Sequence, residues 1–182
     1  ATVLLKVWQF SCIGVIHNTA LESALDDWRQ GKESEARDRL HNIDKPIAKI
    51  VRHAMQLLRQ SSHNVELARE ETIRLASIEL QHSRQYLRIL EVIATLSPLL
   101  GLFGTVIGMI DAFQQLESAG SAVDPSILSG GIWVALLTTA AGLAVAIPSI
   151  ILLNYLEGIA EKYKAEMEDS ITRVFTASAY RS

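Results

Sequence analysis

The sequence has little of the chemistry that marks soluble enzymes. Its single cysteine, Cys12, excludes an internal disulfide and any CxxC metal or redox motif. Its five histidines fall in no HExxH or related ligand spacing, so we expect no metal site. We find no nucleophile elbow, no phosphate-binding loop and no set of groups that could serve as nucleophile, base and oxyanion stabiliser. The residues therefore argue against an enzyme, and we expect no cofactor.

Charged side chains are missing from two long stretches, residues 92–110 and 125–156. The hydrocarbon core of a bilayer, roughly 30 Å thick, is crossed by about 20 helical residues. Either stretch is long enough to cross it. The sequence therefore predicts a transmembrane hairpin, with spans over residues 92–113 and 131–156 and a loop over residues 114–130.

Lysine and arginine are absent between Arg88 and Lys162, while the predicted loop and its edges carry only the acids Asp111, Glu117 and Asp124. By the positive-inside rule, the loop then lies outside the cytoplasm and both flanks lie within it. The loop is therefore expected to be periplasmic. The distribution of the charges therefore informs topology, and with a net charge of −3 we expect no nucleic-acid partner.

The first 16 residues are apolar except for Lys6 and Gln9. Lys6, Trp8 and Phe10 are typical of the edge of a bilayer, where cations and aromatic rings gather. We interpret residues 1–16 as the cytoplasmic end of a first transmembrane helix whose beginning is missing. An amphipathic surface helix is the alternative.

Residues 17–91 are predicted to form a cytoplasmic helical domain, with Gly31 as a turn between short helices and Pro46 near the start of a long one. No glycine or proline interrupts residues 47–97, so this helix is expected to enter the membrane as one rod. Residues 157–182 have helical spacing and are expected to form a C-terminal cytoplasmic helix that packs against it. A heptad-like stripe follows the rod: Ile47, Val51, Ala54, Leu58, Ser61, Val65, Ala68, Thr72 and Leu75.

Small residues recur every three or four positions in both predicted spans. Lipid gives helices no hydrophobic reason to associate, so close packing across small residues is the usual solution. The predicted helix-packing positions are Gly101, Gly104, Gly108, Gly142 and Ala146. Each predicted span therefore has a face of small residues that also carries hydroxyl groups, and two such faces are suited to surround a central helix. Pro98 and Pro148 lie inside the spans and are expected to kink them.

Residues 92–110 and 125–156 hold no Asp, Glu, Lys, Arg or His, so a proton path through them would need a titrating side chain from another chain. Thr105 and Thr139, with Thr138 beside the latter, are the candidate pore-lining residues. A hydroxyl both donates and accepts, and can therefore hold water or solvate a carboxylate. The alternative is that these hydroxyls bond their own helix backbone.

Three motifs, GLFGTV at residues 101–106, ALLTTAAGL at 135–143 and AIP at 146–148, resemble the ExbB/TolQ/MotA proton-channel family, and above all its ExbB and TolQ branch. The resemblance implies an all-α polytopic protein of the bacterial inner membrane. Its long helices would extend into the cytoplasm and its copies would form a homopentameric ring in membrane lipid.

The resemblance also implies partners. An ExbD- or TolR-like single-span subunit would lie inside the ring and supply the titrating aspartate, opposite threonines at positions 105 and 139. A TonB- or TolA-like protein would receive the energy for outer-membrane transport. TolQ-like envelope maintenance and a MotA-like flagellar stator are the rivals within the family.

One position departs from the family pattern. Relatives commonly carry a glutamate immediately before the ALL motif, where this chain has Val134. The loss of that acid puts in doubt any mechanism in which the ring itself relays the proton. Outside the family, the rival hypothesis is a non-conducting membrane scaffold or sensor that works through the heptad-like stripe.

Overall fold

The computed structural model describes residues 19–60, 64–119 and 125–180, and all regular structure in these ranges is α-helical. The helices are α2 (Thr19–Arg29), α3 (Glu33–His41), α4 (Pro46–Gln60), α5 (Val65–Ala119) and α6 (Pro125–Ala179). The all-α class is confirmed. The interpretation of residues 1–16 concerns residues outside the described ranges.

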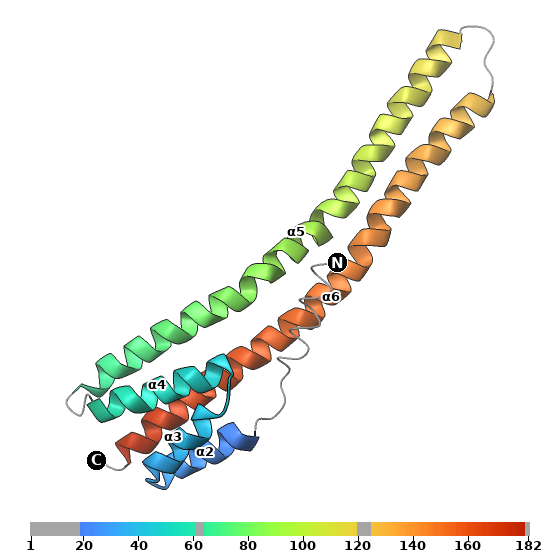
Figure 1. Cartoon of the computed structure of the whole chain (residues 1–182). Helices are drawn as coiled ribbons and strands as arrows, with labels where there is room; N and C mark the ends of the chain where they lie inside the picture. The colour runs from blue at the N-terminus through green and yellow to red at the C-terminus, as the bar shows by residue number, and fades with distance from the viewer. Residues whose placement is uncertain (1–18, 61–63, 120–124, 181–182) are drawn as a thin grey trace. The chain divides into compact units, whose positions relative to one another are not determined.

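Contacts divide the chain into two units. The first, here called the helical domain, comprises the described residues up to Gln85 and from Leu156 onward. The second, here called the hairpin, runs from Tyr86 to Tyr155. Both α5 and α6 contribute one end to each unit (Figure 1).

Large apolar side chains form the core of the helical domain. Helices α2, α3 and α4 share this core with the C-terminal part of α6 (Figure 1). Residues 157–182 were predicted to pack against the helix that begins near residue 47, and they share the core with that helix, α4. The largest fully buried apolar side chains are Leu21, Leu40, Val51, Met55, Met167 and Val174. The Trp28 indole N–H donates to the Val174 carbonyl at 3.1 Å, which joins α2 to α6 inside this core.

The turn between α2 and α3 falls at Gly31, as predicted. Gly31 has φ 81°, a left-handed conformation that glycine adopts without steric cost. Its N–H donates to the Trp28 carbonyl at 3.1 Å, and the Lys32 N–H donates to the Asp27 carbonyl at 2.9 Å. These bonds satisfy carbonyls at the end of α2.

The prediction of one rod from residue 47 into the membrane is wrong. Helix α4 begins at Pro46, as predicted, but it ends at Gln60, and α5 begins at Val65. The Asn64 side-chain carbonyl accepts the Leu67 N–H at 3.1 Å, so Asn64 caps a new helix. The cap at Asn64 therefore begins a new helix at a point where the sequence has no glycine or proline.

The break also divides the heptad-like stripe. Ile47, Val51, Ala54, Ala68 and Thr72 are all buried in the helical domain. They therefore pack within the chain and do not offer a free surface.

Ion pairs fasten α6 to the rest of the helical domain. The Arg173 guanidinium lies 2.8 Å from a Glu22 carboxylate oxygen, 3.5 Å from Asp26 and 3.8 Å from Asp169. The hydrogen bond to Glu22 raises the pKa of Arg173 above its usual range. Arg84 on α5 pairs with Glu161 on α6 at 2.5 Å.

Helices α5 and α6 are the two in the described residues that are long and apolar enough to cross a membrane. Their most apolar windows have mean hydropathies of 1.9 and 2.2, and only 11% and 6% of those windows are buried. A core helix of a soluble domain would be mostly covered, so this exposure is consistent with membrane insertion. The helices reach Ala119 and restart at Pro125, so helix occupies both ends of the range predicted as a loop.

Candidate functional site

The two arms of the hairpin pack backbone against backbone at its middle. A Cβ added to Gly142 would lie 2.6 Å from the Ser97 carbonyl oxygen and 3.0 Å from the Gly101 Cα. A Cβ added to Gly101 would lie 3.0 Å from the Thr138 carbonyl oxygen. No side chain fits in these positions, so the approach of the helices depends on both glycines.

The contact continues toward the loop. A Cβ at Gly104 would lie 2.6 Å from the Thr138 hydroxyl oxygen, and one at Gly108 would lie 3.1 Å from the Ala135 Cβ. We call the whole contact the hairpin seam: Ala94, Ser97, Gly101, Gly104, Gly108 and Ala112 on α5 with Gly131, Ala135, Thr138, Gly142 and Ala146 on α6. Its alanines are at most 4% exposed.

This seam changes the interpretation of the small-residue faces. They were expected to surround a helix of another chain, whereas in the structure they cover one another within one chain. A Cβ added to Gly131 would lie 2.4 Å from the Ala112 Cβ, so Gly131 belongs to the same contact. The sequence prediction missed this residue. Its position four residues before Ala135 was the available signal.

The hydroxyl groups make different bonds. Thr105 donates to the Leu102 carbonyl at 2.6 Å, within its own helix. Thr138 donates to its own helix at the Ala135 carbonyl, 2.7 Å away, and lies 3.3 Å from the Gly101 carbonyl of α5. Thr139 donates across the seam to the same Gly101 carbonyl, at 3.4 Å. Thr105 and Thr138 therefore bond the backbone of their own helix, which was the alternative given for these hydroxyls, whereas Thr139 bonds the backbone of the other helix.

Helical geometry places Thr105 and Thr139 on the same flank of the hairpin. Thr105 lies four residues after Gly101, a rotation of about +40° from the seam, and Thr139 lies three residues before Gly142, a rotation of about +60°. In antiparallel helices that face one another, positive rotations lead to the same side. Thr138, at about −40° from Gly142, points to the other flank, where it meets Gly104.

Val134 is the residue that the family resemblance assigns to the position of a glutamate. It lies eight residues before Gly142, about −80° around α6, and so belongs to the flank of Thr138. Its side chain is 54% exposed. The acid-to-valine departure therefore adds apolar surface on the flank opposite Thr139.

Pro98 and Pro148 both lie within continuous helices. Each lacks an amide proton and leaves one carbonyl of the preceding turn without its helical donor. The predicted kinks stay predictions.

Large apolar side chains cover the outer surface of the hairpin. On the α5 arm the most exposed are Ile89, Leu99, Leu100, Leu102, Phe103, Ile107, Ile110 and Phe113. On α6 they are Trp133, Val134, Leu136, Leu137, Val145, Ile147, Ile151 and Tyr155. Such a surface requires lipid or protein around it.

Comparison with known proteins gives the family. The model of the MotA/TolQ/ExbB proton channel family matches residues 42–169, more than half of the chain. The chain belongs to this family. The matched range includes the hairpin seam and all three candidate threonines.

The relatives found are named for ExbB. The chain is 38% identical to biopolymer transport protein exbB1 of Vibrio cholerae over 54% of this chain and 45% of that protein. It is 32% identical to a putative biopolymer transport protein ExbB homolog of Methanothermobacter thermautotrophicus over 86% of this chain and 54% of that protein. The chain thus spans about half the length of these curated relatives.

Proposed function

We propose that the chain is a ring-forming subunit of a motor in the bacterial inner membrane that is driven by the proton-motive force. It conducts protons together with an ExbD- or TolR-like partner and passes energy to a TonB- or TolA-like protein for outer-membrane transport. Family membership and the names of the relatives, biopolymer transport proteins, support this proposal.

The proposal rests on one observation: the membrane segments carry hydroxyl groups on one flank but no acidic side chains. Residues 92–110 and 125–156 hold no Asp, Glu, Lys, Arg or His, while helical geometry places Thr105 and Thr139 on one flank of the hairpin. A proton relay in a membrane normally uses a carboxylate or another titrating group. In this proposal the partner supplies that carboxylate, and the flank with Thr105 and Thr139 faces it as a neutral, hydrogen-bonding wall.

Topology and assembly follow from the same proposal. The loop between α5 and α6 is periplasmic, and the helical domain and the C-terminal end of α6 are cytoplasmic, because lysine and arginine are absent between Arg88 and Lys162 and occur on both sides of that stretch. Five copies form the ring, with the exposed leucines and valines facing lipid or neighbouring copies. A potential of 100 mV supplies roughly 2.3 kcal/mol per charge, so several protons would drive one mechanical step.

The scaffold alternative receives less support. It required the heptad-like stripe as a working surface, but most of that stripe is buried in the helical domain. A scaffold also has no need for a flank that carries two hydroxyls.

Proton flux into liposomes tests the proposal. The chain is reconstituted with and without an ExbD-like partner, and Thr139→Val and Thr105→Val are compared with Thr138→Val, a matched control on the opposite flank. We expect flux that requires the partner, falls by about tenfold or more when a hydroxyl facing the path is lost, and changes little in Thr138→Val. Partner-dependent flux that is normal in Thr139→Val and Thr105→Val would refute the site. No flux with any partner would refute the function.

A further inference from the structure

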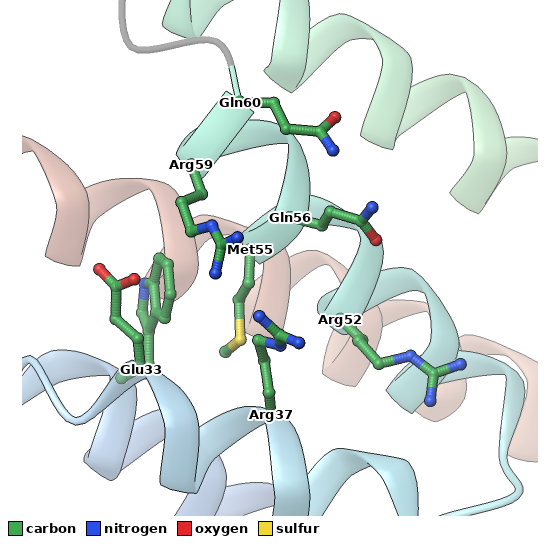
Figure 2. A pocket seen from close by; sticks show the side chains of 8 residues that line it. Glu33, Arg37, Arg52, Met55, Gln56, Arg59 and Gln60 are labelled. Carbon is green, nitrogen blue, oxygen red and sulfur yellow. The ribbon is translucent and has the colours of Figure 1, made fainter.

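A cationic pocket lies within the helical domain, between α2, α3 and α4. Its volume is about 190 Å³. Its lining residues are Trp28 on α2, Glu33 and Arg37 on α3, and Arg52, Met55, Gln56, Arg59 and Gln60 on α4. Figure 2 shows the Arg37 and Arg59 side chains directed from two helices into the same space beside Met55.

The arginines of the helical domain fall into two groups, and the three of this pocket belong, with Arg29 and Arg69, to the group without an ion pair among the described residues. Arg39, Arg74, Arg84 and Arg173 each pair with a carboxylate. Among the described residues, none of the ion pairs includes an arginine that lines the pocket. Glu33 is the one acid in the lining, so the pocket carries an excess of positive charge.

The floor of the pocket is apolar and fixed. Trp28 is 3% exposed and Met55 1% exposed, and the Trp28 indole is held by its bond to the Val174 carbonyl. An apolar floor lowers the local dielectric and strengthens the interaction of an anion with the guanidinium groups above it. The Gln56 and Gln60 side-chain amides on the same helix add neutral donors.

Size and donor geometry select the ligand. Sites for drug-sized molecules occupy roughly 300–1,000 Å³, so this smaller cavity suits a single compact group. The planar fork of a guanidinium matches the oxygens of a phosphate, to which it donates two parallel hydrogen bonds. We propose that the pocket binds a phosphoryl group, carried by a small soluble phosphate ester or by an anionic phospholipid headgroup.

The bound group would join α3 to α4, because Arg37 comes from one helix and Arg52 and Arg59 from the other. Any ligand that binds only the folded state raises stability, by an amount that grows with the logarithm of the ligand concentration once this exceeds the dissociation constant. The phosphoryl group is therefore expected to stabilise the helical domain, independently of proton conduction by the hairpin.

Calorimetric titration of the 182-residue chain in detergent tests this site. The probes are inorganic phosphate, a short-chain soluble phosphatidic acid and, as anions of other shape, citrate and chloride. Arg37→Gln and Arg59→Gln should each weaken phosphoryl binding by about tenfold or more, because each removes a charge-assisted bond. Arg37→Lys keeps the charge without the fork and should weaken binding less, while Glu33→Gln should tighten it. Arg69→Gln, a change at an exposed arginine of α5, is the matched control and should bind normally.

The outcomes separate the two sources of the phosphoryl group. Arginine-dependent binding of inorganic phosphate that is at least as tight as that of the phosphatidic acid identifies a soluble ester, and arginine-dependent binding of the phosphatidic acid that is much tighter identifies a lipid headgroup. The thermal midpoint of each unliganded variant checks its fold, and Arg37→Lys keeps the test valid if Arg37→Gln unfolds. The proposal is overturned if neither phosphoryl probe binds, if citrate and chloride bind equally well, or if the pocket variants bind like Arg69→Gln.

Discussion

The helical domain and the hairpin associate their helices by opposite means. In the helical domain, leucines, methionines and Trp28 fill a core and ion pairs such as Arg173–Glu22 close its surface. In the hairpin, the large apolar residues are on the outside, and glycines and alanines form the interior contact. Water drives large apolar side chains inward in the first case, whereas lipid offers no such force in the second. One amphipathic rule therefore cannot be applied along the whole of α5 or α6.

The largest effect is expected from a side chain placed in the hairpin seam. Gly142→Leu would drive atoms into the Ser97 carbonyl and the Gly101 Cα, which are backbone and cannot turn aside. The cost should exceed the ~1–3 kcal/mol of ordinary overpacking, and the hairpin should separate. Thermal unfolding and gel filtration in detergent measure the loss.

Gly130→Leu and Gly158→Leu are the matched controls, since no atom lies within 4 Å of a Cβ at either position. They should retain most of the wild-type stability. Equal damage at all three glycines would mean that helix propensity, and not the seam, sets the effect.

A second comparison makes the same substitution in both units. Leu40 is 0% exposed and Leu100 is 66% exposed. Leu40→Ala should destabilise the helical domain by about 2–5 kcal/mol, because it leaves a cavity. Leu100→Ala should change the stability in detergent by no more than ~0.5 kcal/mol, and similar losses at both positions would show that Leu100 is covered.

The smallest effect concerns the ion pairs of the helical domain. Arg173→Gln leaves Glu22, Asp26 and Asp169 without their shared cation. Because Arg173 is 35% exposed, we expect a loss of about 1 kcal/mol or less, greater at low salt than at high salt. Chemical denaturation at two salt concentrations measures it, and a loss that does not depend on salt would mean that side-chain packing dominates.

The sequence predicted those features that depend on local chemistry. The missing charges marked the two apolar helices, Gly31 and Pro46 marked a turn and a helix start, and the three- and four-residue spacing marked the small faces. Local sequence did not predict which helix covers each small-residue face. Nothing in the spacing of Gly101 and Gly142 states whether the small face that covers each belongs to the same chain, and only the fold brings them together.

Other features escaped because they depend on residues far apart in the sequence. The end of α4 rests on the cap at Asn64, which a rule based on glycine and proline overlooks. The arginine pocket assembles residues from three helices, and their individual positions resemble an ordinary solvated face. The opposite flanks of Thr138 and Thr139, although adjacent in sequence, became clear only once the seam was fixed.

Cross-linking tests most directly whether the seam closes within one chain. The double variant Gly108→Cys with Ala135→Cys is made in a Cys12→Ser background, since a Cβ at Gly108 would lie 3.1 Å from the Ala135 Cβ. Chains labelled with heavy nitrogen and unlabelled chains are mixed before assembly and oxidised in the membrane, and the linked peptides are weighed by mass spectrometry. Our account predicts cross-linked peptides that are wholly heavy or wholly light. Peptides that join a heavy to a light segment would place the seam between chains and contradict it.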